Sequence, residues 1–301
     1  MRVGMIGLGK MGANMTRRLL GGGHEVVALD RDAAAVKAVA AVGAVPAQSI
    51  EDLLRQLPAP RAVWMMVPAG AITEQTIESL TPLLSENDLI ADGGNSYYKD
   101  SMRRAAALAA RGIQFVDVGT SGGIGGLKEG YSLTFGGTPA AAKRLEPVFK
   151  TLAPATDRGW AHVGPSGAGH FTKMVHNGIE YAMMQAYAEG FDLLQHKTDF
   201  KLDLAQIAQV WQSGSVVRSW LLDLTAAALT QNPTLTGIAP YVEDSGEGRW
   251  TVMEGIELGV ALPTISLSLF SRFRSRDKDS YRDKLLAAMR NQFGGHAIKK
   301  D

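Results

Sequence analysis

The first half of the chain alternates short apolar runs with helical patterns, whereas the second half consists of long, periodic helical stretches. Short runs rich in Val, Ile and Leu that end in Gly, Pro or Asp predict β-strands bounded by turns. The expected strands are Val3–Ile6, Glu25–Leu29, Ala62–Val67, Asp88–Ala91, Gln114–Val118, Leu133–Phe135 and a weaker one near His162.

Helical patterns lie between several of these runs, at Met11–Leu20, Ala33–Ala44, Ser49–Leu57 and Lys99–Ala110. Such alternation predicts parallel strands joined by right-handed crossovers, with a ligand crevice where the strands of a doubly wound sheet end. The Ala- and Val-rich stretch Ala33–Ala44 further predicts a buried helix.

A Gly-Pro-Ser-Gly turn at residues 164–167 separates the two halves of the chain. From Ala168 to about Gln195 the chain holds no Pro and few Gly, which predicts a long helix. A length of 301 residues is ordinary for two domains. We therefore expect a doubly wound α/β domain over residues 1–166 and an all-α domain over residues 167–301.

Composition excludes several classes of protein. A hydrophobic fraction of 46% and a charged fraction of 20% are ordinary for a globular chain, and a net charge of +1 indicates no nucleic-acid partner. With no Cys and no pair of His one helical turn apart, we expect no metal site. No apolar run approaches the roughly 18 to 20 residues of a membrane helix, and Lys10 interrupts the N-terminus, so we expect a cytoplasmic protein with no membrane partner.

The N-terminal strand runs directly into a Gly-rich turn at the start of an expected helix. This pattern is typical of a Rossmann-like dinucleotide site: Gly7 permits the tight turn, Gly9 lets backbone N–H groups approach a pyrophosphate, and Gly12 permits close helix–strand packing. On the alternative interpretation, the glycines serve the turn only. The candidate cofactor-binding turn consists of Gly7, Leu8, Gly9, Lys10, Met11 and Gly12.

Asp30, at the end of the second expected strand, decides between two cofactors. A carboxylate there can accept hydrogen bonds from both hydroxyls of an adenosine ribose, and it would repel the 2′-phosphate of NADP. Arg31 follows directly and could partly accommodate that phosphate. We therefore expect NAD as the cofactor, with NADP as the weaker alternative.

Three loops that follow expected strands combine Gly or Pro with small side chains, at residues 66–68, 91–96 and 117–123. The first can flank a nicotinamide, and backbone N–H groups in the other two can bind a carboxylate. Each loop by itself could equally be a plain turn. The candidate residues are Val67, Pro68, Asn95, Ser121, Gly122 and Gly123.

One face of the expected long helix carries a stripe of polar side chains. At 100° per residue the stripe spans an arc of about 140°, and the neighbouring Met174 and Ile179 indicate that the helix is buried around it. A Lys that acts as a general base needs its pKa lowered by roughly three units, which burial does, and a carboxylic acid two turns along can deliver a proton. The stripe consists of Lys173, His176, Asn177, Glu180 and Tyr181.

These motifs resemble those of the decarboxylating 6-phosphogluconate dehydrogenases, in particular their short form, within the β-hydroxyacid dehydrogenase superfamily. The similarity extends over nearly the whole chain, and its most specific part is K-M-V-H-N-G-I-E-Y at residues 173–181, of which other superfamily members usually keep only the Lys and the Asn. The remaining motifs are G-L-G-x-M-G at 7–12, D-G-G-N-S at 92–96, S-G-G at 121–123, G-x-G-R-W-T at 246–251 and F-G-G-H at 293–296.

The resemblance implies oxidative decarboxylation of 6-phosphogluconate to ribulose 5-phosphate and CO2, with reduction of NAD. By the same resemblance, Lys173 takes the proton from the C3 hydroxyl, Glu180 protonates C1 of the enediol that forms when CO2 leaves, and Asn177 is a third catalytic residue. It also implies a homodimer or homotetramer in which the C-terminal tail reaches a neighbouring active site. The implied substrate-binding residues are Asn95, Ser121, Gly122, Gly123, His176, Asn177, Tyr181, Arg249, Thr251, Arg272, Arg290 and His296.

Charge near the C-terminus agrees with an anionic substrate. Residues 271–301 hold nine Lys or Arg against four Asp, which suits a phosphate and a carboxylate, although solvated ion pairs give the same pattern. Three features depart from the long form of the family: the chain is shorter, Arg249 stands where Lys is frequent, and Asp30 replaces a residue that accepts the NADP phosphate.

Two other functions stay open at this point. A non-decarboxylating 3-hydroxyacid dehydrogenase, of the 3-hydroxyisobutyrate or tartronate semialdehyde type, would act on substrates without phosphate and leave Arg249 and Arg272 without a role. A catalytically idle NAD-binding sensor would not need Lys173 and Glu180, and both are present.

Overall fold

The computed structural model describes residues 1–299, which fold into two compact units: residues 1–176 (unit 1) and the residues from 177 onward (unit 2). Helix α8 (Ala168–His196) passes from one unit into the other. The last two residues of the cationic C-terminal segment, Lys300 and Asp301, lie outside the described residues.

Unit 1 is built on one eight-stranded sheet with the order β3-β2-β1-β4-β5-β6-β7-β8. β1 pairs with β2 and β4, and β4 with β5, all parallel, so their carboxyl ends meet at one edge. All seven expected strands are present, and β3 is an addition too short to leave a periodic pattern. The strands are β1 (Arg2–Ile6), β2 (Glu25–Leu29), β3 (Val45–Pro46), β4 (Ala62–Met65), β5 (Leu89–Asp92), β6 (Gln114–Ser121), β7 (Ser132–Gly137) and β8 (Trp160–Gly164).

One pair of strands contradicts the expectation of parallel strands. β6 and β7 run antiparallel, with Ser121 opposite Ser132. Residues 122–131 join them through a single turn of 3-10 helix, η2 (Gly123–Gly125), and the short helix α6 (Gly126–Glu129). This link is shorter than the dozen or more residues that a crossover between parallel strands needs, so the chain can only turn back along its neighbour.

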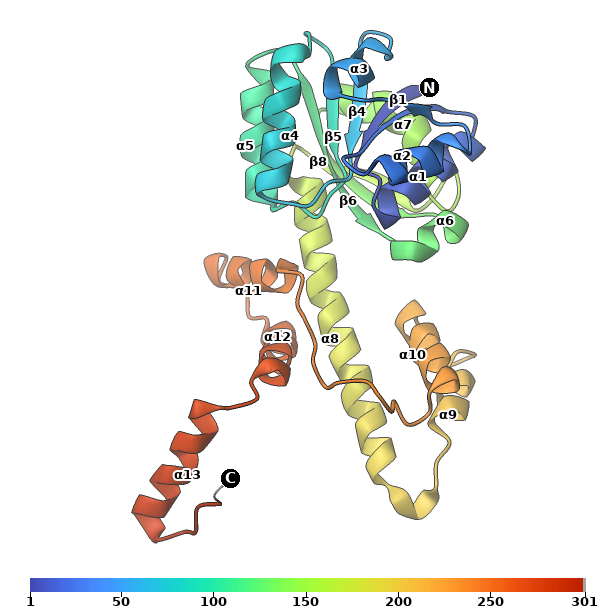
Figure 1. The fold of residues 1–301 in the computed structure, drawn as a ribbon. Helices are drawn as coiled ribbons and strands as arrows, with labels where there is room; N and C mark the ends of the chain where they lie inside the picture. The colour runs from blue at the N-terminus through green and yellow to red at the C-terminus, as the bar shows by residue number, and fades with distance from the viewer. Residues whose placement is uncertain (300–301) are drawn as a thin grey trace. The chain divides into compact units, whose positions relative to one another are not determined.

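Helices cover both faces of the sheet (Figure 1), and a separate apolar cluster fills each side. Neighbouring residues of β4 alternate between the clusters: Trp64 lies in one, whereas Val63 and Met65 lie in the other. The helices of unit 1 besides α6 and the start of α8 are α1 (Lys10–Gly21), α2 (Ala33–Ala40), α3 (Ile50–Arg55), α4 (Ala71–Leu80), η1 (Thr81–Leu83), α5 (Tyr98–Ala109) and α7 (Pro139–Leu152).

The expected helices agree with α1, α3 and α5 to within a few residues, but the expectation of a buried helix at Ala33–Ala44 is wrong. α2 ends at Ala40, and only its Val39 is buried. Ala is the best helix former, so an Ala-rich run is equally compatible with a helix on the surface. The sequence pattern also did not single out α4 and α7 as helices.

The described part of unit 2 holds helices and loops only, which confirms the expected all-α fold after a Rossmann-like α/β fold. Its apolar core is small, with Phe191 of α8 packed among buried residues of α9 and α10. Within residues 1–299, no helix is both long and apolar enough to cross a membrane. The helices that follow α8 are η3 (Thr198–Phe200), α9 (Leu204–Trp211), α10 (Trp220–Gln231), α11 (Glu247–Glu257), α12 (Pro263–Arg276) and α13 (Tyr281–Gly294).

Candidate active site

The Gly-rich turn between β1 and α1 leaves no room for side chains at two of its glycines. Gly7 has a φ of 94°, and a Cβ there would lie 2.5 Å from the backbone oxygen of Met66. A Cβ at Gly12 would lie 2.0 Å from the backbone oxygen of Gly7. The tight turn and the close helix–strand packing therefore both depend on glycine.

The third glycine of the turn faces open space. Gly9 is the N-cap of α1, and a Cβ there would meet nothing within 4 Å. The neighbouring Lys10 is exposed and Met11 half-buried. Backbone N–H groups at the start of a helix suit an anion, so this surface fits the pyrophosphate of a dinucleotide.

Asp30 lies against the same turn. Its Oδ2 accepts a hydrogen bond from the Leu8 backbone N–H at 2.5 Å, and its Oδ1 accepts one from the Asp32 N–H at 2.8 Å. Asp30 is half-buried, whereas Arg31 is exposed. The carboxylate is thus fixed at the end of β2 beside the Gly-rich turn, where the fingerprint requires an acceptor for a ribose.

The loops that follow β4 and β5 pack against each other. A Cβ at Gly94 would lie 2.8 Å from the backbone oxygen of Val67. The next residue of the first loop, Pro68, accepts a hydrogen bond at its carbonyl from the Thr73 hydroxyl at 2.9 Å. Asn95 is exposed at the tip of the second loop. The structure therefore brings Val67, Pro68 and Asn95 together at the same edge of the sheet as the Gly-rich turn.

Lys173 is buried against β6, with only 8% of its surface exposed. A Cβ at Gly119 would lie 2.5 Å from the Cβ of Lys173, so glycine at this strand position makes room for the lysine. The Lys173 Nζ lies 3.4 Å from His176 Nδ1, and His176 Nε2 lies 3.4 Å from the Ser121 Oγ. Three of the expected site residues, Lys173, His176 and Ser121, thus lie together within unit 1.

The Ser-Gly-Gly sequence at the end of β6 has an irregular backbone. Gly122 and Gly123 have φ values of 132° and 50°, in a region that residues with a side chain rarely adopt. This conformation turns the chain into η2 and leaves Gly123 exposed. Backbone N–H groups of such a turn can bind a carboxylate.

Asp117 lies in the third candidate loop, but the sequence analysis assigned it no role of its own. It is fully buried in β6, and its two carboxylate oxygens accept hydrogen bonds from the backbone N–H groups of Gly167 and His170, at 2.6 and 2.8 Å. These bonds fix the first turn of α8 to the sheet, and Lys173 lies one turn further on. A carboxylate inside an apolar strand always needs partners, and this signal was available in the sequence.

Within unit 2, the polar stripe of α8 packs against α11. The Asn177 amide donates a hydrogen bond to Glu247 Oε2 at 2.5 Å, and both residues are buried. A Cβ at Gly178 would lie 2.7 Å from the Cγ2 of Thr251, which is also buried. Glu247 fills the variable position of G-x-G-R-W-T, so the motif alone did not draw attention to it.

A cluster of Arg side chains surrounds Tyr181 and the start of α11. The Arg272 guanidinium lies 3.6 Å from the centre of the Tyr181 ring. Arg249 and Arg276 each form an ion pair of 2.9 Å with Asp244. The Arg249 guanidinium beside Asp244 lowers the pKa of that carboxyl to about 2. Guanidinium groups in such a cluster can bind the oxygens of a phosphate.

The remaining expected site residues are Glu180, Arg290 and His296. Glu180 is half-buried on α8, two helical turns after Lys173. Met174 is buried as expected, but Ile179 is 50% exposed, so the expectation that both flank a buried stripe is wrong for Ile179. Arg290 lies on α13 and His296 beyond it. Within residues 1–299, no hydrogen bond or ion pair joins Arg290 or His296 to Arg249 or Arg272.

The described residues hold no group of three or more His, Cys, Asp or Glu that could bind a metal ion.

Two family models match the chain. Residues 2–164 match the NAD binding domain of 6-phosphogluconate dehydrogenase, and residues 169–294 match the C-terminal domain of 6-phosphogluconate dehydrogenase. The two matches together extend over both units.

Relatives with known names agree with these models. The NAD(+)-dependent, decarboxylating 6-phosphogluconate dehydrogenase of Haloferax volcanii is 44% identical over 301 residues, which cover 100% of this chain and 99% of its own. The NADP(+)-dependent, decarboxylating enzyme of Bacillus subtilis is 36% identical over 292 residues, which cover 92% of this chain and 62% of its own.

Solved structures show the same fold. The 6-phosphogluconate dehydrogenase of Plasmodium falciparum has a TM-score of 0.84 at 26% identity, and the match covers 100% of this chain and 66% of that one. The Mycobacterium tuberculosis 3-hydroxyisobutyrate dehydrogenase has a TM-score of 0.70 at 22% identity, with 89% and 90% covered, and this likeness shows the fold alone. From the family models and the relatives that match over its full length, the chain belongs to the 6-phosphogluconate dehydrogenase family.

Proposed function

We propose that this protein oxidises and decarboxylates 6-phosphogluconate to ribulose 5-phosphate and CO2, and that NAD is reduced in the reaction. The observation that carries the proposal is the position of Lys173, which is buried against Gly119 and lies close to His176 and Ser121. The chain also belongs to the 6-phosphogluconate dehydrogenase family. Burial disfavours the charged form of a lysine, which is the condition for a lysine to act as a base near neutral pH.

The proposed chemistry assigns one proton transfer to each end of the polar stripe. A bound nicotinamide supplies the acceptor for the hydride that leaves C3 of the substrate. Lys173 takes the proton from the C3 hydroxyl and, once protonated, polarises the C3 carbonyl while CO2 leaves. Glu180, two turns along the same helix, then donates a proton to the carbon that has lost CO2, which is C2 of the substrate and C1 of the product.

The other site residues divide between the two anionic ends of the substrate. Asn95, Ser121, His176 and Asn177, with the backbone at Gly122 and Gly123, are proposed to hold the carboxylate and the hydroxyl groups. For the phosphate, the Arg side chains around Tyr181 support the proposal, because guanidinium groups bind phosphate oxygens in pairs. The phosphate-binding residues on this proposal are Tyr181, Arg249, Thr251 and Arg272, completed by Arg290 and His296.

NAD is the proposed cofactor in preference to NADP, because Asp30 places a fixed negative charge where NADP carries its 2′-phosphate. Asp30→Asn keeps an oxygen that can accept the hydrogen bond from the Leu8 N–H and removes only the charge. We expect this variant to lower the ratio of kcat/KM for NAD over NADP by about tenfold, equivalent to about 1.4 kcal/mol. Asp32→Asn is the matched control, since Asp32 caps α2; an equal shift in both variants would contradict the role of Asp30.

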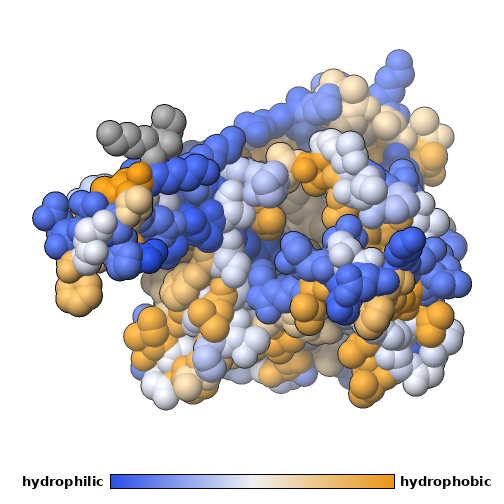
Figure 2. Space-filling model, turned by 90° about the horizontal axis from the view of Figure 1, so that it is seen from below, coloured by the Kyte–Doolittle hydropathy of each residue, from blue (hydrophilic) through white to orange (hydrophobic). Residues whose placement is uncertain are grey.

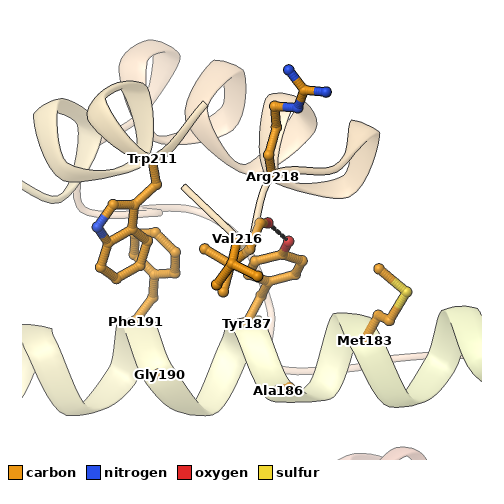
Figure 3. A pocket seen from close by; sticks show the side chains of 9 residues that line it. Met183, Ala186, Tyr187, Gly190, Phe191, Trp211, Val216 and Arg218 are labelled. Carbon is orange, nitrogen blue, oxygen red and sulfur yellow. Dashed lines mark hydrogen bonds between the residues drawn. The ribbon is translucent and has the colours of Figure 1, made fainter. Parts of the chain in front are cut away.

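A homo-oligomer is part of the same proposal. Figure 2 shows hydrophobic residues at the surface among hydrophilic ones. Unit 2 exposes many large apolar side chains, including Leu193 and Ile256 at 74% and 75%. An apolar pocket between α8 and the α9–α10 segment is also open in the single chain, with Phe191, Trp211 and Val216 around it (Figure 3). Exposed apolar surface of this extent marks a site of association, and a second copy of the chain is the proposed partner.

Initial rates with phosphorylated and unphosphorylated substrates test the proposed function. We expect kcat/KM for NAD reduction to be at least about a hundredfold higher with 6-phosphogluconate than with 3-hydroxyisobutyrate or the reduced form of tartronate semialdehyde. The reason is that each hydrogen bond between a phosphate and a charged side chain contributes about 1.5–3 kcal/mol. Faster reduction of NAD with an unphosphorylated acid would contradict the proposal that 6-phosphogluconate is the substrate. No reduction with any of these substrates, in a protein that binds NAD, would favour the catalytically idle NAD-binding sensor.

The cytoplasmic location expected from the sequence belongs to the same proposal.

A further inference from the structure

A chain of buried and half-buried charges runs behind the loop that carries Asn95. Asp92 at the end of β5 has no exposed surface, and Arg104 of α5 is 3% exposed. Their closest charged atoms, Asp92 Oδ2 and Arg104 Nη1, lie 3.7 Å apart. Arg104 Nε donates a hydrogen bond to Glu74 Oε2 at 2.9 Å. The exposed Arg103 binds both oxygens of the same Glu74, at 2.9 and 2.8 Å.

Asp92 determines the shape of this loop. Its Oδ1 accepts a hydrogen bond from the Gly94 backbone N–H at 3.1 Å, and its Oδ2 accepts one from the Ser96 hydroxyl at 2.7 Å. Both groups flank Asn95, so the exposed Asn95 is held between two residues that are tied to one buried carboxylate.

The buried carboxylate of Asp92 has a cation beside it. A buried charge without a partner of opposite charge is strongly disfavoured, so buried charges are found in pairs. Arg104 is the cation at ion-pair distance from Asp92. Hydrogen bonds from Arg103 and then Arg104 lower the pKa of Glu74 to about 2, so Glu74 stays ionised and holds Arg104 in place.

The same helix that carries Glu74 also fixes the facing loop. Thr73 of α4 is fully buried and donates a hydrogen bond to the Pro68 carbonyl at 2.9 Å. A Cβ at Gly94 would touch the backbone oxygen of Val67, so the two loops are already at their closest approach. Neighbouring residues of α4, Thr73 and Glu74, therefore hold one loop directly and the other through Arg104 and Asp92.

We propose that Arg104 is a positioning residue for the proposed reaction: through Asp92 it fixes the backbone at residues 93–96 and so places Asn95 relative to Val67 and Pro68. Arg104 itself does not touch substrate or cofactor on this proposal. The inference deepens the proposed function and rests on it, because Asn95 is a site residue only if that function is correct.

The test compares Arg104→Met with Arg103→Met. Met keeps most of the length of the side chain and removes the charge. Arg103→Met removes the exposed ion pair with Glu74 but not the contacts of Arg104 with Glu74 and Asp92. At pH 7 Glu74 stays ionised without Arg103, because its ordinary pKa is 4.5. We expect Arg104→Met to lower kcat/KM for 6-phosphogluconate by about tenfold to a hundredfold, the effect of a misplacement of about 1 Å, with most of the loss in kcat. Arg103→Met should stay within about twofold of the unchanged protein, and Arg104→Lys should recover most of the loss.

A double-mutant cycle with Asn95→Ala separates positioning from general damage. If Arg104 acts through Asn95, the Arg104→Met change should cost less than about twofold in the Asn95→Ala background, because the misplaced side chain is already absent. If the double variant loses kcat/KM by the product of the two single losses, the proposal is overturned. A loss of kcat/KM below about twofold for Arg104→Met alone would also overturn it.

Two further measurements keep the outcome clear. If Arg104→Met does not fold, Ser96→Ala removes one of the two bonds that Asp92 makes to the loop, and the same cycle with Asn95→Ala applies. If the unchanged protein does not oxidise 6-phosphogluconate, the proposed function fails by itself. The position of the loop is then read from the fluorescence and affinity of bound NADH: a shift for Arg104→Met and none for Arg103→Met supports the inference, and equal behaviour of the two overturns it.

Discussion

Unit 1 closes its own apolar core, whereas unit 2 leaves most of its large apolar side chains at the surface. Two clusters fill the faces of the sheet in unit 1, and its central strands β1, β4, β5 and β6 are almost entirely buried. In unit 2 the described residues form only one small cluster, around Phe191 of α8. The exposed side chains of unit 2 include Leu193, Val210, Ile256 and Phe270.

The difference shows how the two parts obtain their stability. Burial of apolar surface stabilises a fold by about 25 cal/mol per Å², and unit 1 obtains this within one chain. Unit 2 obtains less of it within its own small cluster, and on the proposal above a second copy covers the exposed helices. The candidate site follows the same division, because the nucleotide turn and Lys173 lie in the self-contained unit and the Arg cluster lies in the open one.

The largest expected effect separates chemistry from cofactor binding. Lys173→Met should lower kcat by about 10² to 10⁴, the usual range for loss of a general acid–base group, and leave the Kd for NADH nearly unchanged, because the Gly-rich turn is not touched. Lys197→Met, at an exposed lysine paired with Asp199, is the control. Normal turnover in the Lys173→Met variant would show that Lys173 is not the general base.

The next effect tests whether unit 2 depends on a second copy. Leu193→Asp places a charge on an exposed apolar position of α8, and it should weaken self-association by about tenfold or more, since burying a Leu contributes about 1.5–3 kcal/mol. Val42→Asp, at an exposed position of unit 1, should have no effect. Light scattering during gel filtration over a dilution series measures both. An unchanged mass for Leu193→Asp at every concentration would contradict the proposed interface on α8.

A smaller effect is expected in substrate affinity. Arg249→Ala should raise KM for 6-phosphogluconate by about tenfold or more with a much smaller change in kcat, because a hydrogen bond to a charged group contributes about 1.5–3 kcal/mol to binding. Arg274→Ala is the matched control, since Arg274 is another exposed Arg of unit 2 that is paired with a carboxylate, that of Asp277. Equal changes in KM for both variants would show that only the overall charge matters.

The smallest effect concerns the acid stability of unit 1. Folding lowers the pKa of Glu74 from 4.5 to about 2, through the Arg103 hydrogen bonds first. The folded protein therefore holds this proton less tightly than the unfolded chain, so the stabilisation is complete above pH 4.5 and is lost as the pH falls toward 2. Glu74→Gln should lower the free energy of unfolding at pH 7 by more than it does near pH 3.

Urea unfolding at several pH values measures this difference, with Glu78→Gln on the same helix as the control. A gap between Glu74→Gln and the unchanged protein that stays constant from pH 7 to pH 3 would contradict the role of the ion pairs.

Much of unit 1 could be predicted because its signals are local. The strand at Glu25–Leu29 and the turn at Gly7–Gly12 are determined by apolar runs and glycines that act on their neighbours in the chain. The antiparallel direction of β7 could not be read from its own residues, since it depends on the short link before it. The exposure of α2 also depends on what packs against it.

The candidate site was predictable where one element carries several residues. The spacing on α8 identified Lys173, His176 and Asn177 together, because a helix fixes which side chains share a face. Gly119, Asp117 and Glu247 were missed, since each acts by touching α8 from another element. Only the fold brings such residues together.

The most direct test of the central claim is the ratio of CO2 released to NADH formed with 6-phosphogluconate as substrate. We expect one CO2 for each NADH, because the oxidised product is a β-keto acid that Lys173 holds in the position for decarboxylation. NADH formed without CO2 would show a dehydrogenase that stops at oxidation, and it would contradict the proposed roles of Lys173 and Glu180 in the second half of the reaction.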